Sequence, residues 1–182
     1  MELWDIYDVE RNKTGRTMER GPVPEGDYHL VVHVCIFNSK GEMLIQQRQS
    51  YKEGWPNLWD VSVGGSAVIG DSSQKAAERE VNEELGLTID LQGVRPHFTN
   101  NFDRGFDDFY LIEMEVNVEE LKLQEEEVQA AKWATKEEIL ELLSQGKFIP
   151  YYKELIDFLF AIRKNYGIIV KENRNAGEEK RL

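Results

Sequence analysis

The sequence predicts an α/β domain in which a mixed β-sheet is sandwiched between helices, an α/β/α arrangement. The chain has 182 residues, a usual length for one domain, and 41% of them are hydrophobic. Short runs of β-branched residues alternate irregularly with amphipathic helical patterns, and no internal repeat or long linker divides them. We therefore assign residues 1–170 to a single domain and the charged residues 171–182 to a disordered tail.

The first third of the chain has mainly strand patterns. Residues 1–28 predict an extended β-hairpin that precedes the core of the domain. The runs LVVHVCIFN (30–38) and MLIQQRQ (43–49) predict two buried strands. Residues 51–59 predict a loop with two tryptophans, and DVSV (60–63) predicts a short strand that stops at the following pair of glycines.

The remaining chain mixes both patterns. We expect a helix over about 72–85, a hairpin of strands over 95–102 and 107–116, and a solvated acidic stretch over 117–127. A strand over 128–135 and amphipathic helices over 136–146 and 150–167 complete the expected order.

The helix over 72–85 carries a cluster of acidic residues. Glu80, Glu83 and Glu84 fall within an arc of roughly 100° on a helical projection, where like charges repel each other. An apolar stripe spaced by four residues lies beside this arc and docks the helix. The spacing alone fits two interpretations: a solvated acidic face, or carboxylates whose repulsion a hard cation such as Mg²⁺ or Mn²⁺ relieves.

Both ends of this helix carry capping signals. Asp71, Ser72 and Ser73 are all good N-cap residues, and Asp71 with Gln74 resembles a capping box. Gly86 fits the left-handed position just past the C-terminus. These signals predict a helix whose acidic cluster is held in place.

The run GSAVIGDSSQKAAEREVNEELGL, residues 65–87, resembles the Nudix box, G-x5-E-x7-R-E-U-x-E-E-x-G-U, where U is a bulky aliphatic residue. One position departs from it, because Asp71 stands where the family has glutamate. The resemblance implies the Nudix fold and covers about residues 28–145. The positions that match are Gly65, Arg79, Glu80, Val81, Glu83, Glu84, Gly86 and Leu87.

Nudix hydrolases cleave a diphosphate linked to another moiety, using water and a divalent metal ion. The resemblance therefore implies Mg²⁺, with Mn²⁺ as a substitute, and a small-molecule diphosphate substrate. It makes Glu80 and Glu84 the direct metal ligands and Glu83 a third ligand or one that acts through water. It makes Arg79 the group that orients Glu83, and it offers the carbonyl oxygen of Gly65 to a metal. Arg79, Glu83 and Glu84 are thus catalytic candidates.

The general base is left open, since Nudix branches use either a glutamate of the box or one on a later loop. Here that loop carries Glu126 and Glu127, and we take Glu127 as a further catalytic candidate. Arg48, at the end of a predicted strand, is a candidate phosphate contact or an ordinary exposed arginine. We expect Asp71 to be structural.

Several other residues have two interpretations each. Trp55 and Trp59 can stack on a substrate or fill the core beneath their loop. His29 and His33 share one face of a strand, where satisfied core histidines are the default. Cys35 is expected to be a small buried residue.

The branch of the family is a separate question. The N-terminal region and the run WPNLWDVSVGG look most like proteins related to isopentenyl-diphosphate isomerase. In the isomerases the loop before the box carries a reactive cysteine followed by Gly-His, whereas DVSVGGS has neither cysteine nor histidine. Cys35 lies on the wrong strand to replace it, although His29 matches a metal-binding histidine of the isomerases. A hydrolase is favoured; an isomerase and a non-catalytic diphosphate-binding sensor are the alternatives.

Charge and composition narrow the partners. The net charge of −12 disfavours nucleic acid, which binds mainly to basic surfaces, and an anionic substrate then requires a cation at its site. No leader or membrane-spanning run is visible, and a lone cysteine suits a reducing compartment, so we expect a cytoplasmic protein without a membrane partner. The hairpin and the last helix are candidate surfaces for a homodimer.

Overall fold

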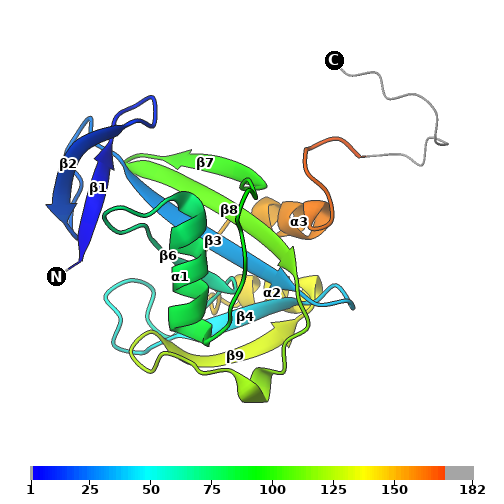
Figure 1. Cartoon of the computed structure of the whole chain (residues 1–182). Coiled ribbons are helices and arrows are strands. Elements are labelled where there is room, and N and C mark those ends of the chain that lie inside the picture. Colours follow the sequence, from blue (N-terminus) through cyan, green and yellow to red (C-terminus); the bar gives the residue numbers. More distant parts are fainter. Residues whose placement is uncertain (1, 171–182) are drawn as a thin grey trace, which may run out of the picture.

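The computed structural model describes residues 2–170 of the chain, and the predicted tail over 171–182 lies outside the described residues (Figure 1). Its centre is a seven-stranded sheet with the order β5-β4-β3-β8-β7, in which β6 also pairs with β3 and β9 with β4. The pair β3–β8 is parallel and the other pairs are antiparallel, so the sheet is mixed. Its strands are β3 (His29–Phe37), β4 (Met43–Arg48), β5 (Trp59–Asp60), β6 (Val63–Ser66), β7 (Phe98–Phe102), β8 (Gly105–Glu113) and β9 (Val128–Ala134).

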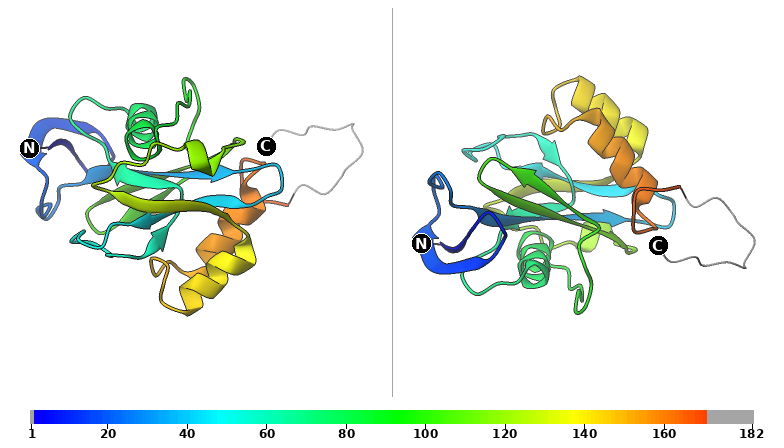
Figure 2. Two further views of the ribbon diagram at one scale, coloured as in Figure 1. Left: turned by 90° about the horizontal axis from the view of Figure 1, so that it is seen from below. Right: turned by 90° about the horizontal axis from the view of Figure 1, so that it is seen from above.

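Helices cover both faces of this sheet. Helix α1 (Ser73–Leu85) lies on one face, and α2 (Lys136–Ser144) with α3 (Lys153–Ile162) lies on the other (Figure 2). A short 3-10 helix, η1 (Val118–Glu120), precedes β9. The predicted α/β/α sandwich is confirmed.

Alternation along β3 explains why two separate cores form. Val32 and Val34 point to one face and pack in the core beneath α1. Cys35 and Phe37 belong to the opposite core, beneath α2 and α3. Complete burial of a Val or Phe side chain contributes about 1.5–3 kcal/mol, so a strand with two apolar faces is stable only between two helical layers.

Strands β3 and β4 pair at their turn, where Phe37 lies opposite Met43, and then separate. The segment 59–66 runs through this space, first as β5 against β4 and then as β6 against β3. The buried hydroxyl of Ser62 accepts a hydrogen bond from the backbone of Ile36 and donates one to β4. The prediction that this strand stops at the glycine pair is wrong, because β6 continues through both glycines to Ser66.

Two other expected elements differ in extent. The strand predicted over 95–102 begins at Phe98, two residues after Pro96, and the helix predicted over 150–167 spans only α3. The stretch over 117–127 is only partly solvated, since Val118, Leu121 and Leu123 pack against the core under α1. Apolar residues dispersed among glutamates gave no clear period from which this packing could be predicted.

Strands β1 (Leu3–Tyr7) and β2 (Lys13–Glu19) form a separate antiparallel sheet. Figure 1 shows this two-stranded sheet beside the loop that joins β6 to α1. It is therefore close to the start of the Nudix box.

Candidate active site

Helix α1 begins and ends close to the predicted residues. Ser72 is the N-cap, and its side chain accepts a hydrogen bond from the backbone of Lys75 at 3.2 Å. Gly86 adopts φ 68° and bonds back to the carbonyl of Asn82, as the sequence predicts. The capping box predicted for Asp71 is wrong, because Asp71 binds the guanidinium of Arg79 instead.

The three glutamates of the box do not share one environment. Glu80 and Glu84 are buried, whereas the side chain of Glu83 is 48% exposed. Val81 and Leu85 dock the helix on the sheet, and this brings Glu80 and Glu84 to the inner side of the acidic arc.

Glu80 lies directly against the backbone of β6. A Cβ atom placed on Gly65 would lie 2.2 Å from the carboxyl carbon of Glu80, closer than any side chain tolerates. Burial, opposed by the neighbouring Arg79, raises the pKa of Glu80 to about 7. A side chain at position 65 would therefore force the carboxylate of Glu80 to move.

Glu84 points toward β4, where Gln46 donates a hydrogen bond to it at 2.8 Å. Burial, with the nearby charge of Glu80, raises the pKa of Glu84 well above its ordinary range. The amide oxygen of Gln46 is buried and has no hydrogen-bond partner in the described structure. Our sequence reasoning missed Gln46, although a polar residue two positions after buried Leu44 on an alternating strand was a visible signal.

Arg79 connects the acidic residues of the box. Its guanidinium donates to Asp71 at 3.1 and 3.2 Å, to Glu80 at 2.9 Å and to Glu83 at 3.1 Å. It also donates to the carbonyl oxygen of Ser66 at 2.9 Å. Although burial opposes its charge, Glu80 and Asp71 raise the pKa of Arg79, which stays cationic. The predicted contact with Glu83 is present, and Asp71 and Glu80 share the same arginine.

The donors around Glu80 and Glu84 fit a hard divalent cation, which prefers carboxylate and amide oxygens. Glu80 is paired with Arg79, whereas Glu84 is bound by the neutral amide of Gln46, whose own oxygen has no partner in the described structure. Within residues 2–170, no three His, Cys, Asp or Glu side chains already converge as a metal cluster. Arg79 binds Glu80 and Gln46 binds Glu84, so a cation at Glu80 would compete with the arginine.

The later loop brings one of its two candidate glutamates close to the box. The backbone of Gln124 bonds to the carbonyl of Glu84 at 3.1 Å, which ties this loop to the end of α1. Glu127 forms an ion pair with Lys52, and its charge contributes to the raised pKa of Glu84. Glu126 is exposed. Of the two, Glu127 lies nearer to the carboxylates.

Of the three remaining candidates in residues 48–59, Arg48 and Trp59 have structural contacts. The side chain of Arg48 donates to the carbonyl oxygen of Gly54 at 3.0 Å and so braces the loop. Trp59 packs against the core beneath α2 and α3, and the ammonium group of Lys132 lies 4.8 Å from the centre of its ring. Trp55 is 52% exposed, so it does not fill the core.

The two histidines of β3 lie in different surroundings. His29 packs between Trp4 and Phe102, and burial lowers its pKa. His33 stacks on Phe109, with 3.4 Å between its Nε2 atom and Asp107. Both Nδ1 atoms are buried without a hydrogen-bond partner in the described structure, so neither is the fully satisfied core histidine we expected.

Cys35 is completely buried, and burial raises the pKa of its thiol, in agreement with the expected small apolar role. Asp60 is a second buried polar residue, after Gln46, that our sequence reasoning missed. The hydroxyl of Tyr151 donates to Asp60 at 2.9 Å, and burial raises the pKa of Asp60. Asp60 in turn contributes to the raised pKa of Glu84 across the space between β3 and β4.

A hollow of about 390 Å³ lies beside His33 on the α3 side of the sheet. Gly64 faces His33, because a Cβ atom on Gly64 would lie 3.0 Å from the Nδ1 atom of His33. The next residue, Gly65, faces Glu80. Since successive residues of a strand point to opposite faces, one strand separates the hollow from the carboxylates. The hollow is lined by Phe98, Thr99, Asn100, Asp107, Phe109, Pro150, Tyr151, Tyr152 and Leu155.

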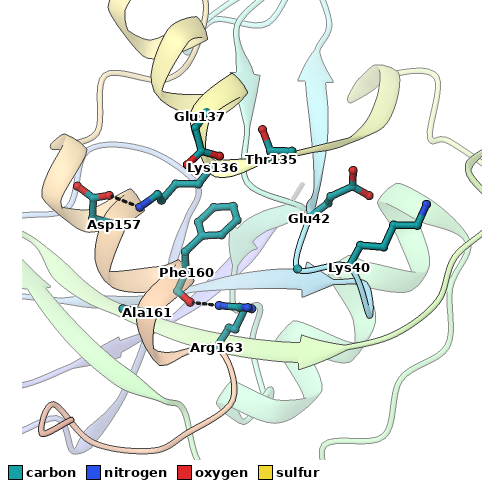
Figure 3. Close-up of a pocket in the computed structure, with 10 residues that line it drawn as sticks. Lys40, Glu42, Thr135, Lys136, Glu137, Asp157, Phe160, Ala161 and Arg163 are labelled. Carbon is teal, nitrogen blue, oxygen red and sulfur yellow. Dashed lines mark hydrogen bonds and ion pairs between the residues drawn. The ribbon is translucent and has the colours of Figure 1, made fainter.

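A second hollow, of about 380 Å³, opens at the β3–β4 turn between α2 and α3 (Figure 3). It is lined by Lys40, Lys136 and Arg163, together with Glu42 and Asp157. Lys136 pairs with Asp157 at 3.1 Å, and Arg163 donates to the carbonyl oxygen of Phe160 (Figure 3). No residue of the Nudix box lines this second hollow.

Comparison with known proteins identifies the family of this chain. The family model described as the NUDIX domain matches residues 27–155, so the chain belongs to the Nudix family. An uncharacterized Nudix hydrolase of Listeria monocytogenes is 54% identical over 153 residues, which cover 84% of this chain and 90% of that protein. The chain is thus a Nudix hydrolase, and hydrolases of this family act on small molecules that contain a diphosphate and generally use divalent metal ions.

More distant relatives include a member of the isomerase branch. An isopentenyl-diphosphate Delta-isomerase of Salmonella arizonae is 30% identical over 145 residues, covering 74% of this chain and 78% of the isomerase. A crystal structure from Deinococcus radiodurans superposes with a TM-score of 0.70 at 23% identity, over 86% of this chain and 98% of that one. This structural similarity supports the fold.

No helix in the described part of the chain is both long and apolar enough to cross a membrane.

Proposed function

We propose that this protein is a Mg²⁺-dependent hydrolase that cleaves the diphosphate linkage of a nucleoside diphosphate joined to another moiety, or of a related organic diphosphate. The supporting observation is the pair of buried carboxyls, Glu80 and Glu84, held between β6 and β4 beside the arginine of the box. Burial of two like-charged groups is costly without a cation. A metal site offsets that cost and attracts an anionic substrate to an acidic protein.

In this proposal Glu80 and Glu84 hold the cation, Glu83 is a third ligand or acts through water, and the carbonyl of Gly65 is a further donor. When bound, the metal neutralises phosphate oxygens and lowers the pKa of water. Arg79 keeps Glu80 and Glu83 in place through charge-assisted bonds.

Glu127 is our candidate for the group that accepts the proton of the attacking water. Its loop is bonded to the end of α1 and its carboxylate is partly buried, paired with Lys52. Glu126, one residue earlier, is exposed and provides a natural comparison. Arg48 stays a weaker candidate for phosphate, because its Nε atom already braces the loop at Gly54.

The hollow beside His33 is our candidate site for the moiety attached to the diphosphate. Its aromatic walls suit a planar ring, and Asp107 with Asn100 supplies hydrogen-bonding groups at the edge of such a ring. An isoprenoid chain would remove water from the carboxylate of Asp107 without replacing its hydrogen bonds, which is unfavourable. This chemistry favours a nucleoside over an isoprenoid diphosphate.

The isomerase alternative has less support. Ser62 occupies the stretch where the isomerases carry their cysteine, and its hydroxyl is bonded to two backbone groups. Cys35 is completely buried, with a raised thiol pKa, and His29 is enclosed by Trp4 and Phe102.

The single buried cysteine also agrees with a cytoplasmic location, which we propose for this enzyme.

The test is a screen for released phosphate and pyrophosphate with Mg²⁺ over nucleotide sugars, ADP-ribose, nucleoside triphosphates, and isopentenyl and geranyl diphosphates. We expect release that depends on metal and is lost in Glu84→Gln. Conversion of isopentenyl diphosphate without release, followed by NMR, would establish the isomerase instead. Binding of a diphosphate with neither release nor conversion would establish a sensor.

A further inference from the structure

The two-stranded sheet of β1 and β2 contacts the turn that opens the Nudix box helix. The backbone N–H of Ile69 donates to the carbonyl of Leu3 at 2.8 Å, and that of Gly70 donates to the carboxylate of Asp5 at 2.9 Å. Lys13 donates to the carbonyl oxygen of Asp71 at 2.9 Å. Three consecutive residues of the box are therefore bound by residues far away in the sequence.

Lys13 and Asp5 act as one unit in these contacts. The ammonium group of Lys13 lies 2.7 Å from Asp5, whose carboxylate also accepts the Gly70 bond. Burial, which opposes the charge of each group, is outweighed by their mutual bond, so the pKa of Asp5 is lowered and that of Lys13 is raised. The pair stays charged at neutral pH and keeps both contacts with the turn.

The turn held by this pair carries the residue at which the box departs from its family pattern. Asp71 closes the turn, since its backbone N–H donates to the carbonyl of Val68 at 3.0 Å. Its carboxylate accepts two bonds from Arg79, which in turn holds Glu80 and Glu83. A continuous path of hydrogen bonds thus leads from Lys13 to the carboxylates of the candidate metal site.

A second contact holds the start of α1. Arg11, in the turn between β1 and β2, forms an ion pair with Asp108 on β8, a residue that is completely buried. The hydroxyl of Ser73, the first residue of α1, donates to the same carboxylate, as does that of Thr99 on β7. Arg11 therefore links the hairpin to the first turn of the box helix and to a strand that lines the hollow beside His33.

We propose that the N-terminal hairpin is a positioning element for the Nudix box, and that Lys13 acts through Asp71 and Arg79 to set the positions of the metal-binding carboxylates. The side chain of Asp71 is one methylene shorter than the glutamate of the family, so its contact with Arg79 depends on the position of the turn over residues 68–71. The hairpin holds that turn by three hydrogen bonds. This inference rests on the proposed metal-dependent function. It assigns Lys13 and Arg11 to the active site as positioning residues that touch neither substrate nor metal.

The test compares Lys13→Met, the conservative Lys13→Arg, and the matched control Arg16→Met. Arg16 is an exposed cation on the same strand, and it pairs with Asp27 and not with the box. Two measurements are made on each full-length variant: binding of Mn²⁺ alone by electron paramagnetic resonance, and hydrogen exchange of residues 68–80 by mass spectrometry. Thermal unfolding checks that each variant is folded.

We expect Lys13→Met to bind Mn²⁺ about 10-fold more weakly or worse, the usual effect of losing a group that orients a ligand. Exchange over residues 68–80 should become faster in the same variant. Arg16→Met should match the wild type, and Lys13→Arg should recover most of the loss. A purely structural role of Lys13 would instead increase exchange throughout the domain and not over residues 68–80 in particular.

Two results would overturn the inference: unchanged Mn²⁺ affinity in Lys13→Met, or exchange over residues 68–80 that equals that of the control. Failure of the wild-type protein to bind Mn²⁺ is a different outcome, because it contradicts the proposed metal site itself. In that case the exchange comparison alone decides whether the hairpin positions the box. Local acceleration supports the positioning role, and unchanged exchange refutes it.

Discussion

The backbone of Gly65 lies directly against the carboxylate of Glu80, since a Cβ atom on Gly65 would lie 2.2 Å from the carboxyl carbon of Glu80. Any side chain at the first residue of the Nudix box would therefore displace the carboxylate fifteen positions later. The two residues meet because β6 pairs with the central strand β3 directly beside α1.

Replacement of Gly65 by alanine should displace the carboxylate of Glu80. We expect kcat to fall by about 10-fold or more, because catalytic geometry tolerates little displacement. The measurement is steady-state kinetics at saturating Mg²⁺ with thermal unfolding in parallel. Gly21→Ala is the matched control, because its nearest neighbour would lie at an ordinary 3.8 Å. Equal losses in both variants would contradict a local effect.

Replacement of Glu84 by glutamine keeps the shape of the side chain and removes its charge. We expect kcat to fall by roughly 10²-fold or more, since this removes a proposed metal ligand. Glu137→Gln, on the exposed surface of α2, removes one charge away from the box and should leave kcat unchanged. Equal turnover of Glu84→Gln and wild type at saturating Mg²⁺ would refute the assignment of Glu84.

Glu127 and Glu126 form a natural matched pair for locating the general base. We expect Glu127→Gln to lower kcat by about 10²-fold, within the usual range for a group that transfers a proton. Glu126→Gln should change kcat little, because Glu126 is exposed. The measurement is steady-state kcat for both variants at saturating Mg²⁺. The reverse order of effects would move the base to Glu126, and two small effects would move it to the box.

The metal-free protein should lose stability as pH rises through the titration of Glu80. The pKa of this carboxyl rises from an ordinary 4.5 to about 7 on folding, mainly through burial, so the folded state binds the proton more tightly. Its stabilising contribution is complete below about pH 4.5 and is lost as pH rises through about 7. The raised pKa of Glu84 also makes the free energy of unfolding fall as pH rises.

Urea unfolding of chelator-treated protein between pH 4.5 and 8 measures this effect. Glu80→Gln should reduce the dependence on pH over that window, whereas the exposed Glu137→Gln should not. An unfolding free energy that depends on pH equally in wild type and Glu80→Gln would show that Glu80 does not titrate as its burial implies.

Tyr152 tests the hollow as the site for the moiety attached to the diphosphate. Its side chain lines the hollow and is 85% exposed, so Tyr152→Ala should leave the fold intact. We expect KM to rise by roughly 10-fold with little change in kcat, because stacking that is equal in ground and transition states affects binding alone. Tyr51→Ala, which removes another exposed tyrosine, is the control. An unchanged KM in Tyr152→Ala would place the moiety elsewhere.

Much of the box was predictable because its information is local. The helix with its Gly86 stop, the apolar stripe of Val81 and Leu85, and the Arg79–Glu83 contact all involve residues at helical spacings. Asp71 was assigned the wrong partner, because the competing Arg79 contact depends on the conformation of the turn as well as on spacing. The solvated stretch over 117–127 was also only partly right, since its apolar residues have no clear period.

The sequence by itself determined the α/β/α class, the family and the acidic cluster, because periodicity and motif spacing need no knowledge of distant contacts. Tertiary structure alone decided which carboxylates are buried, that Gln46 meets Glu84, and that Glu127 lies nearer to the box than Glu126. It also placed Lys13 on the turn of Asp71, 58 residues away along the chain. Pairs of this kind depend on strand register and on where α1 docks, and both are set by packing of the whole sheet.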